Sequence, residues 1–304
     1  KYVLGAQGNV WTEYMSTTNQ VEYMAFPRIL AMSEVVWRGA TIDLETDYPD
    51  FLSRVEPFMS RMDVLDINYA NHMYDVSGEL IKKDGKLSYK LTSPVPGKHI
   101  VYRLNDVAKD GIYNGPIPIN TSTKIEAAVI LDNNTEGRAH RQTINLHKGI
   151  AGMVSINVEP HQAYRAGGKD ALINGISGSD TRYGDKEWLG FWGDDLEITI
   201  DFGVETNIRK LSTRFYNANG QWIYAPKKVG VQVTLENGSV MNRKADPILS
   251  EGGSLATVSF DLDKKIPVKT RYVTITIPNY GVIPEGLQGA GNKAWTFIDE
   301  IIIE

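Results

Sequence analysis

Apolar residues recur at two different spacings along the chain, and the change falls near residue 75. Between residues 51 and 65 they follow the 3.6-residue period of an amphipathic helix, at Phe51, Leu52, Val55, Phe58, Met59, Met62 and Leu65. From about Asp75 onwards, short segments alternate apolar and polar residues, with Pro, Gly and Asn between the segments. The pattern predicts a helical N-terminal part followed by regions built of β-strands.

The N-terminal part predicts one strand and two helices. Residues 3–6 predict a short buried strand. A first helix is predicted over residues 27–38, because proline is tolerated in a first turn and Gly39 suits the end. A second should begin near Pro49, and Pro57 inside it should kink it at a cost of roughly 3 kcal/mol. Because these elements cannot enclose a core, they favour the last segment of a (β/α) barrel whose other strands lie upstream.

Two β-sandwiches are predicted after the helical part. The smaller one covers residues 75–148, with strands at 87–91, 99–104, 123–130 and 142–146. A linker is expected over residues 148–152. The larger one, residues 153–304, is predicted as a sandwich of jelly-roll type. Its strands are expected at 154–158, 196–202, 208–215, 229–235, 257–262, 271–277 and 296–303.

Composition narrows the classes of function. At 304 residues the chain should hold two or three domains. Its net charge of −5 and its dispersed basic residues argue against nucleic acid as a partner. No run approaches the ~18 apolar residues of a membrane span. The absence of cysteine excludes disulfides, thiolate metal sites and a cysteine nucleophile, and the five histidines lack metal-ligand spacing.

The start of the chain bears on its extent. It has no initiator methionine and no signal peptide, and it opens inside a predicted strand. We therefore expect this chain to be the C-terminal part of a longer protein, so that a missing targeting segment says nothing about export.

Trp11 and Glu13, two residues apart on an extended segment, should point the same way. An indole beside a carboxylate suits a sugar ring, whereas the alternative is a core Trp near a solvated Glu.

Longer motifs around these residues resemble known families. The first set resembles the end of the catalytic barrel of family-20 β-N-acetylhexosaminidases, and comprises LGAQGNVWTE at 4–13, VEYM at 21–24, FPR at 26–28 and AMSEVVW at 31–37. The second set resembles a small Ig-like domain of the chitobiase C-terminal type, and comprises YRLN at 102–105, YNGPI at 113–117 and KIEA at 124–127. The third set resembles a discoidin (factor V/VIII type C) domain, and comprises ALINGI at 171–176, WLGF at 188–191, DFG at 201–203, WIYAPKKV at 222–229 and FIDEI at 297–301.

These resemblances imply a multidomain, mainly β protein: the C-terminal segment of a (β/α)8 barrel (1–66), an Ig-like sandwich (75–148) and a discoidin-like jelly-roll sandwich (153–304). They imply that Trp11 lines the N-acetylglucosamine subsite and that Glu13 binds the sugar's 4- and 6-hydroxyls. The parent would be an exported enzyme that removes terminal N-acetylhexosamine from glycans by substrate-assisted hydrolysis, without a catalytic cofactor. The oligomeric state stays open.

The family's catalytic Asp-Glu pair belongs to a barrel strand upstream of residue 1. The adjacent acidic pairs in this chain, Asp194-Asp195 and Asp299-Glu300, lie in the discoidin-like region. We therefore expect no hydrolysis by this chain alone. Two other interpretations remain open, in which the β modules bind glycans independently or only brace the barrel.

The discoidin-like region carries two further predictions. Its candidate carbohydrate-binding aromatics are Trp222, which follows a turn-like polar run, then Trp192, and Tyr224. Trp188 and Trp295 are expected to pack in the core. The resemblance also implies a structural calcium ion, with Glu300 at a family ligand position and Asn174 where the family usually has Asp. Because Asn supplies a neutral oxygen, the site would be weaker or empty.

Overall fold

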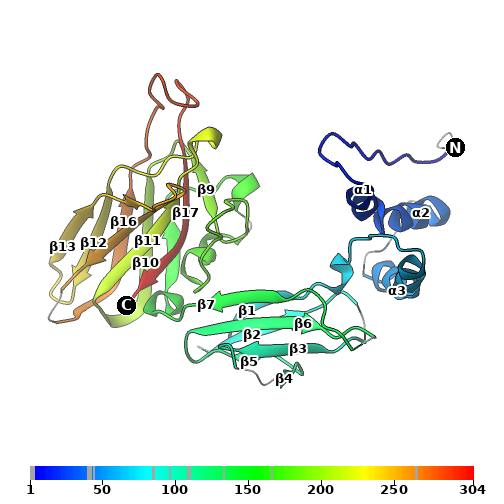
Figure 1. The fold of residues 1–304 in the computed structure, drawn as a ribbon. Coiled ribbons are helices and arrows are strands. Elements are labelled where there is room, and N and C mark those ends of the chain that lie inside the picture. The colour runs from blue at the N-terminus through cyan, green and yellow to red at the C-terminus, as the bar shows by residue number, and fades with distance from the viewer. Residues whose placement is uncertain are drawn as a thin grey trace. The chain divides into compact units, whose positions relative to one another are not determined.

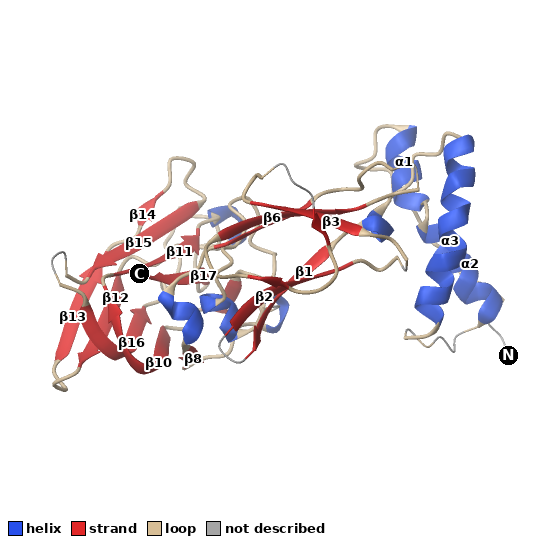
Figure 2. Ribbon diagram, turned by 90° about the horizontal axis from the view of Figure 1, so that it is seen from below, coloured by secondary structure: helices blue, strands red, loops and turns tan. Residues whose placement is uncertain are grey.

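The computed structural model describes residues 4–39, 43, 45–83, 86–95, 97–107, 111–132, 134–165, 167–263 and 266–304. The chain forms two compact units (Figure 1). The first comprises Lys1–Pro118 and Lys124–Gln142, and the second comprises Ile119–Thr123 and Thr143–Glu304. Among the described residues the α-helices lie in the N-terminal segment, and the rest is built on strands with short 3₁₀ helices between them (Figure 2). The mainly β fold predicted from the alternating segments is therefore confirmed.

The helices are α1 (Thr18–Ala25), α2 (Arg28–Arg38) and α3 (Asp47–Val64). The prediction of α2 is confirmed, and Gly39 ends it with a φ of 91°. Helix α3 begins at Asp47 and continues through Pro57. The sequence prediction missed α1, which begins with a capping box between Thr17 and Gln20.

The predicted buried strand at residues 3–6 is wrong for the described residues 4–6. These residues have no strand partner, and Leu4 is fully exposed. A β-strand exists only where a neighbouring strand pairs with its backbone groups, and none of the described segments pairs with this one. Val3 lies outside the described residues. The segment that carries Trp11 is thus extended chain and turns.

Helix α3 supplies the core of the helical part. Its buried side chains are those of Leu52, Val55, Met59 and Met62, and they cluster with Met73 and Val95. These residues fall at helical spacing, so the predicted amphipathic period is confirmed. Phe58 and Leu65, predicted on the same face, are exposed.

Two small antiparallel sheets follow the helices. One has the order β1-β2-β5 and the other the order β4-β3-β6-β7. Their strands are β1 (Ser77–Lys83), β2 (Lys86–Thr92), β3 (Ile100–Leu104), β4 (Gly111–Ile112), β5 (Ile117–Pro118), β6 (Thr123–Val129) and β7 (His140–Ile144). Four of these were predicted, and β1, β4 and β5 were not.

The second unit is a sandwich of two five-stranded sheets with the orders β13-β12-β16-β10-β8 and β14-β15-β11-β17-β9. The strands are β8 (Met153–Ile156), β9 (Leu189–Trp192), β10 (Leu196–Ile208), β11 (Lys210–Tyr216), β12 (Val229–Leu235), β13 (Val240–Ala245), β14 (Ile248–Leu249), β15 (Leu255–Asp261), β16 (Val268–Ile277) and β17 (Trp295–Ile303). Alternate residues of both sheets, such as Ile198, Val231 and Ile275 facing Phe215, Val258 and Ile301, fill one core.

The expected linker at residues 148–152 is a 3₁₀ helix, η2 (Lys148–Ala151), with Gly149 and Ile150 buried. The side chain of His147 caps it by accepting a hydrogen bond from the Gly149 N–H. The chain therefore enters the sandwich through a fixed turn.

Candidate functional site

Trp11 and Glu13 lie on the surface of the helical part. Trp11 is 73% exposed and Glu13 is exposed as well. Trp11 precedes, and Glu13 lies within, a turn in which the Met15 N–H donates to the Thr12 carbonyl at 3.0 Å. In the described part of the chain, neither residue lines the two cavities formed by residues of α2 and α3. The structure thus leaves their predicted roles in a sugar subsite untested.

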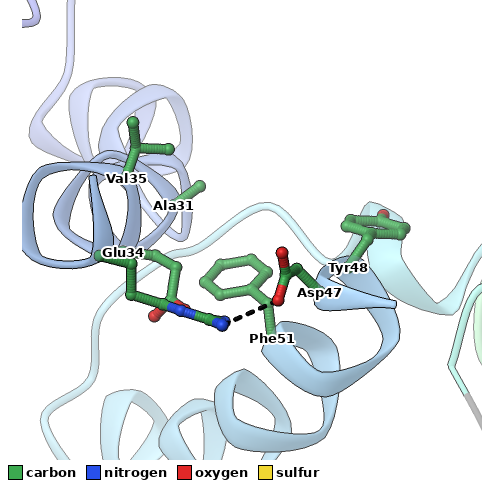
Figure 3. Close-up of a pocket in the computed structure, with 7 residues that line it drawn as sticks. Ala31, Glu34, Val35, Asp47, Tyr48 and Phe51 are labelled. Atoms are coloured by element: carbon green, nitrogen blue, oxygen red, sulfur yellow. Dashed lines mark hydrogen bonds and ion pairs between the residues drawn. The ribbon is translucent and has the colours of Figure 1, made fainter. Parts of the chain in front are cut away.

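A cavity of about 180 Å³ lies between α2 and α3 (Figure 3). Apolar side chains of Ala31, Val35 and Phe51 form its walls. Its charged rim is closed by ion pairs: Arg54 and Arg38 both contact Glu34, and Arg38 donates to Asp47 at 2.8 Å. Hydrogen bonding to Arg54, followed by Arg38, lowers the pKa of Glu34 to about 2. The carboxylate is therefore ionised and paired, which suits structure rather than proton transfer.

The sandwich presents an aromatic surface, here called the aromatic platform, formed by Trp192, Trp295 and His161. Trp192 and Trp295 pair directly across β9 and β17, and their rings stack at a centroid distance of 5.3 Å with 26° between their planes. The Trp192 Nε1 donates to the Lys293 carbonyl at 3.2 Å, which fixes the indole. With one face on Trp295, Trp192 is still 47% exposed.

His161 completes the platform. Its ring meets Trp295 edge-on at 5.1 Å. Its Nδ1 accepts the Ala163 N–H at 3.2 Å, so in the neutral ring the proton is on Nε2. An N–H donor of an exposed histidine therefore lies beside Trp295, which stacks on Trp192, an arrangement that suits a ring with an apolar face and hydroxyl groups at its edge.

The other predicted aromatics hold the surrounding loops. Tyr224 is only 3% exposed, and its hydroxyl donates to the Gln288 carbonyl at 2.9 Å, which corrects the expectation of an exposed ring. Trp222 is half-buried against Tyr224 and Gly289, with a left-handed backbone. Trp188 is fully buried, as predicted.

The acidic pair Asp299-Glu300 lies at a β-bulge in β17. Between the pairs Thr213↔Ile301 and Phe215↔Ile298, these two residues oppose the single residue Arg214 of β11. Both are buried. Arg214 donates to Asp299 from Nε at 3.0 Å and also from its NH2 group.

Burial raises the pKa of Asp299 to about 7, against the opposing effect of Arg214. Burial also raises the pKa of Glu300, whose Oε1 accepts from the Nε2 of His147 at 2.6 Å and from the Gly175 N–H at 2.9 Å. Asn174 Oδ1 accepts the Ile176 N–H at 2.7 Å. Both acids therefore serve internal contacts, as expected for a pair outside the barrel.

The sequence analysis missed the roles of His161, Trp295, Arg214 and His147. No local motif marks them, because their partners lie far away in the chain, 134 residues apart for His161 and Trp295. Among the described residues no group of three or more His, Asp or Glu is placed to hold a metal ion. No described helix is long and apolar enough to cross a membrane.

Comparison with known proteins finds similarity to glycoside hydrolases. Residues 1–40 match the family model of the glycosyl hydrolase family 20 catalytic domain. A β-hexosaminidase of Porphyromonas gingivalis (strain ATCC BAA-308 / W83) is 35% identical to this chain over 109 residues. That match covers 35% of this chain and 14% of the relative. The chain is thus similar to a β-hexosaminidase over about a third of its own residues and spans a small fraction of that relative's length.

Similar solved structures each cover about half of the chain. A Streptococcus pneumoniae fucose binding module, SpX-3, is 14% identical, with a TM-score of 0.33 over 52% of this chain and 97% of that one. GH31 CBM32-2 bound to GalNAc is 17% identical, with a TM-score of 0.34 over 50% of this chain and 97% of that one. Both are carbohydrate-binding modules by their names.

Proposed function

We propose that this chain is the C-terminal part of an exported β-N-acetylhexosaminidase, which removes terminal N-acetylhexosamine from glycans by substrate-assisted retaining hydrolysis. The observation that carries the proposal is the family-20 match over residues 1–40, which contain Trp11 and Glu13. In the complete barrel, Trp11 forms a wall of the sugar subsite and Glu13 accepts hydrogen bonds from sugar hydroxyls.

The chain by itself is proposed to be inactive. A general acid must reach the glycosidic oxygen, but the acids of its Asp299-Glu300 pair are 0% and 1% exposed. In the other adjacent pair, Asp194-Asp195, the Asp195 carboxylate accepts the Asn279 N–H at 2.7 Å and so serves a contact within the sandwich. The test is an assay with p-nitrophenyl N-acetylglucosaminide. We expect no turnover by residues 1–304, and turnover by the polypeptide that joins them to a complete barrel.

The assay has a site-directed arm in the longer polypeptide. Trp11→Ala should weaken substrate binding there, whereas Trp37→Ala, which removes another exposed indole, should not. Activity of the 304-residue chain would refute the proposed inactivity. An inactive longer polypeptide would refute the hydrolase proposal.

A second function, carbohydrate binding, is proposed for the aromatic platform. Trp192 offers a rigid, half-exposed indole face, so stacking costs little side-chain ordering on binding. The Nε2–H of His161 donates to hydroxyls at the ring edge. The ligand class is a glycan end whose pyranose has a continuous C–H face, including N-acetylhexosamine.

Titration calorimetry with N-acetylglucosamine, N-acetylgalactosamine and mucin glycans tests this site. Trp192→Ala should weaken binding about 30-fold, the equivalent of about 2 kcal/mol for a buried tryptophan anchor. Trp37→Ala is the matched control. If the unmutated chain binds a sugar and Trp192→Ala binds it equally well, the aromatic platform is refuted as the binding site. If Trp222→Ala binds it equally well, Trp222 is excluded as a contact residue.

A further inference from the structure

Glu300 is a buried carboxylate that needs compensation within the sandwich. It lies at the β17 bulge, 1% exposed. A charge removed from water at such a place persists only with hydrogen-bond donors or a cation beside it. The resemblance to discoidin domains implies calcium in this role. The question is whether the surroundings of Glu300 fit an ion.

His147 already occupies one carboxylate oxygen, and its own contacts fix its tautomer. The Nδ1 atom accepts from the Gly149 N–H at 3.1 Å and from the Ile303 N–H at 3.3 Å. An atom that faces two N–H donors carries no proton, so the single ring proton is on Nε2. The 2.6 Å contact is therefore an Nε2–H donating to Glu300 Oε1. The imidazole side chain is 2% exposed.

The remaining expected ligand points elsewhere. Asn174 Oδ1 is engaged with the Ile176 N–H in its own turn. The Gly175 N–H, next in the chain, donates to Glu300 at 2.9 Å. Two N–H groups thus direct their positive ends at the carboxylate, where a cation would be repelled.

One atom favours an ion: Glu300 Oε2 has no hydrogen-bond partner in the described part of the chain. Calcium, however, takes six to eight oxygens at about 2.3–2.6 Å. One free carboxylate oxygen and an amide oxygen already in use do not provide such a set, so these residues do not fit the ion.

We propose that His147 replaces the structural calcium ion in this domain, and that the sandwich folds without calcium. The imidazole joins three segments that an ion would otherwise tie together. These are the η2 turn through Gly149, the end of β17 through Ile303, and the bulge through Glu300, which in turn holds Gly175. His147 lies directly before η2, the turn through which the chain enters the sandwich. The same imidazole that contacts Glu300 therefore also fixes that turn.

Metal analysis and thermal unfolding of the 304-residue chain test the proposal. After dialysis against a chelator and then against calcium, we expect much less than one calcium per chain. The Tm of the sandwich, followed by tryptophan fluorescence, should differ by less than about 1 °C between chelator and millimolar calcium, because an ion that does not bind adds no stability. Stoichiometric calcium, or a calcium-dependent rise of more than about 5 °C, would overturn the proposal.

A variant pair tests the role of the histidine. His147→Ala should lower the Tm of the sandwich by more than about 5 °C, because it removes three hydrogen bonds beside a buried carboxylate. His99→Ala, at an exposed histidine, is the control and should shift it by less than about 2 °C. If His147→Ala melts like the unmutated chain, the proposal fails. If the variant does not fold, the metal analysis of the unmutated chain still decides.

Discussion

Removing the guanidinium group of Arg214 should destabilise the sandwich strongly. The change Arg214→Met keeps the length of the stem and its packing but removes the guanidinium. The guanidinium donates to Asp299, to Asp180 at 2.7 Å and to the Gly178 carbonyl at 2.8 Å. It also lies 5.6 Å from the ring centre of Trp188. The loop around residues 178–180 and the β17 bulge would both lose their common partner.

The burial of each partner of Arg214 determines how much free energy of unfolding is lost in Arg214→Met. The Asp180 side chain is 71% exposed, and an exposed ion pair contributes roughly 0–1 kcal/mol. Asp299 is fully buried, and removing one member of a buried pair costs about 3–5 kcal/mol. For a unit of about 150–250 residues that loss lowers the Tm by roughly 6–20 °C.

The double variant Arg214→Met with Asp299→Leu separates the two effects. Because burial outweighs Arg214 in raising the pKa of Asp299 to about 7, the pair returns little of its desolvation cost. An apolar pair of similar volume should therefore recover most of the loss. Urea unfolding monitored by tryptophan fluorescence measures all variants. A single variant within about 1 kcal/mol of the unmutated chain, or a double variant no better than the single one, would refute the reasoning.

Three further outcomes are expected. Gly178→Ala should cost about 1–3 kcal/mol in urea unfolding, because its new methyl group would collide with the buried Trp188 ring. Met62→Ala, at 1% exposure, should cost about 2–5 kcal/mol, whereas Val64→Ala, at 86% exposure, should stay within about 0.5 kcal/mol. Glu34 is ionised in the folded state down to a pKa of about 2, below its ordinary 4.5. Its pairing therefore stabilises above about pH 4.5 and is lost as the pH falls towards 2, so the difference between the unmutated chain and Glu34→Gln should shrink over that window.

The sequence predicted the elements whose pattern is regular. Strand β12 was placed at its observed bounds because Val229, Val231 and Val233 alternate along it. Strands β13 and β14 were missed because both are exposed edge or near-edge strands, so burial imposes little alternation on them. Helix α1 was missed because none of its residues is buried, which leaves no apolar stripe to read.

The candidate site was harder to predict, since a turn-like sequence does not determine which aromatic ring faces solvent. Trp222 follows a polar run, yet Gly289 from a distant loop covers it. Trp192 directly follows the buried Phe191 in an apolar strand, yet alternation turns it outward onto Trp295. Only the pairing of β9 with β17 brings the two indoles together.

The Asp299-Glu300 pair shows why adjacent acids in a sequence do not by themselves indicate catalysis. In a regular strand, neighbouring side chains point to opposite faces of the sheet and cannot both oppose one residue of the next strand. The bulge in β17 places both opposite Arg214, and the structure buries each against a different partner. Asp299 has a guanidinium that remains charged, and Glu300 has an imidazole whose proton is fixed on Nε2. Each acid is held by a different partner inside the sandwich, away from any substrate, so their adjacency serves the joining of β17 to the loops beside it.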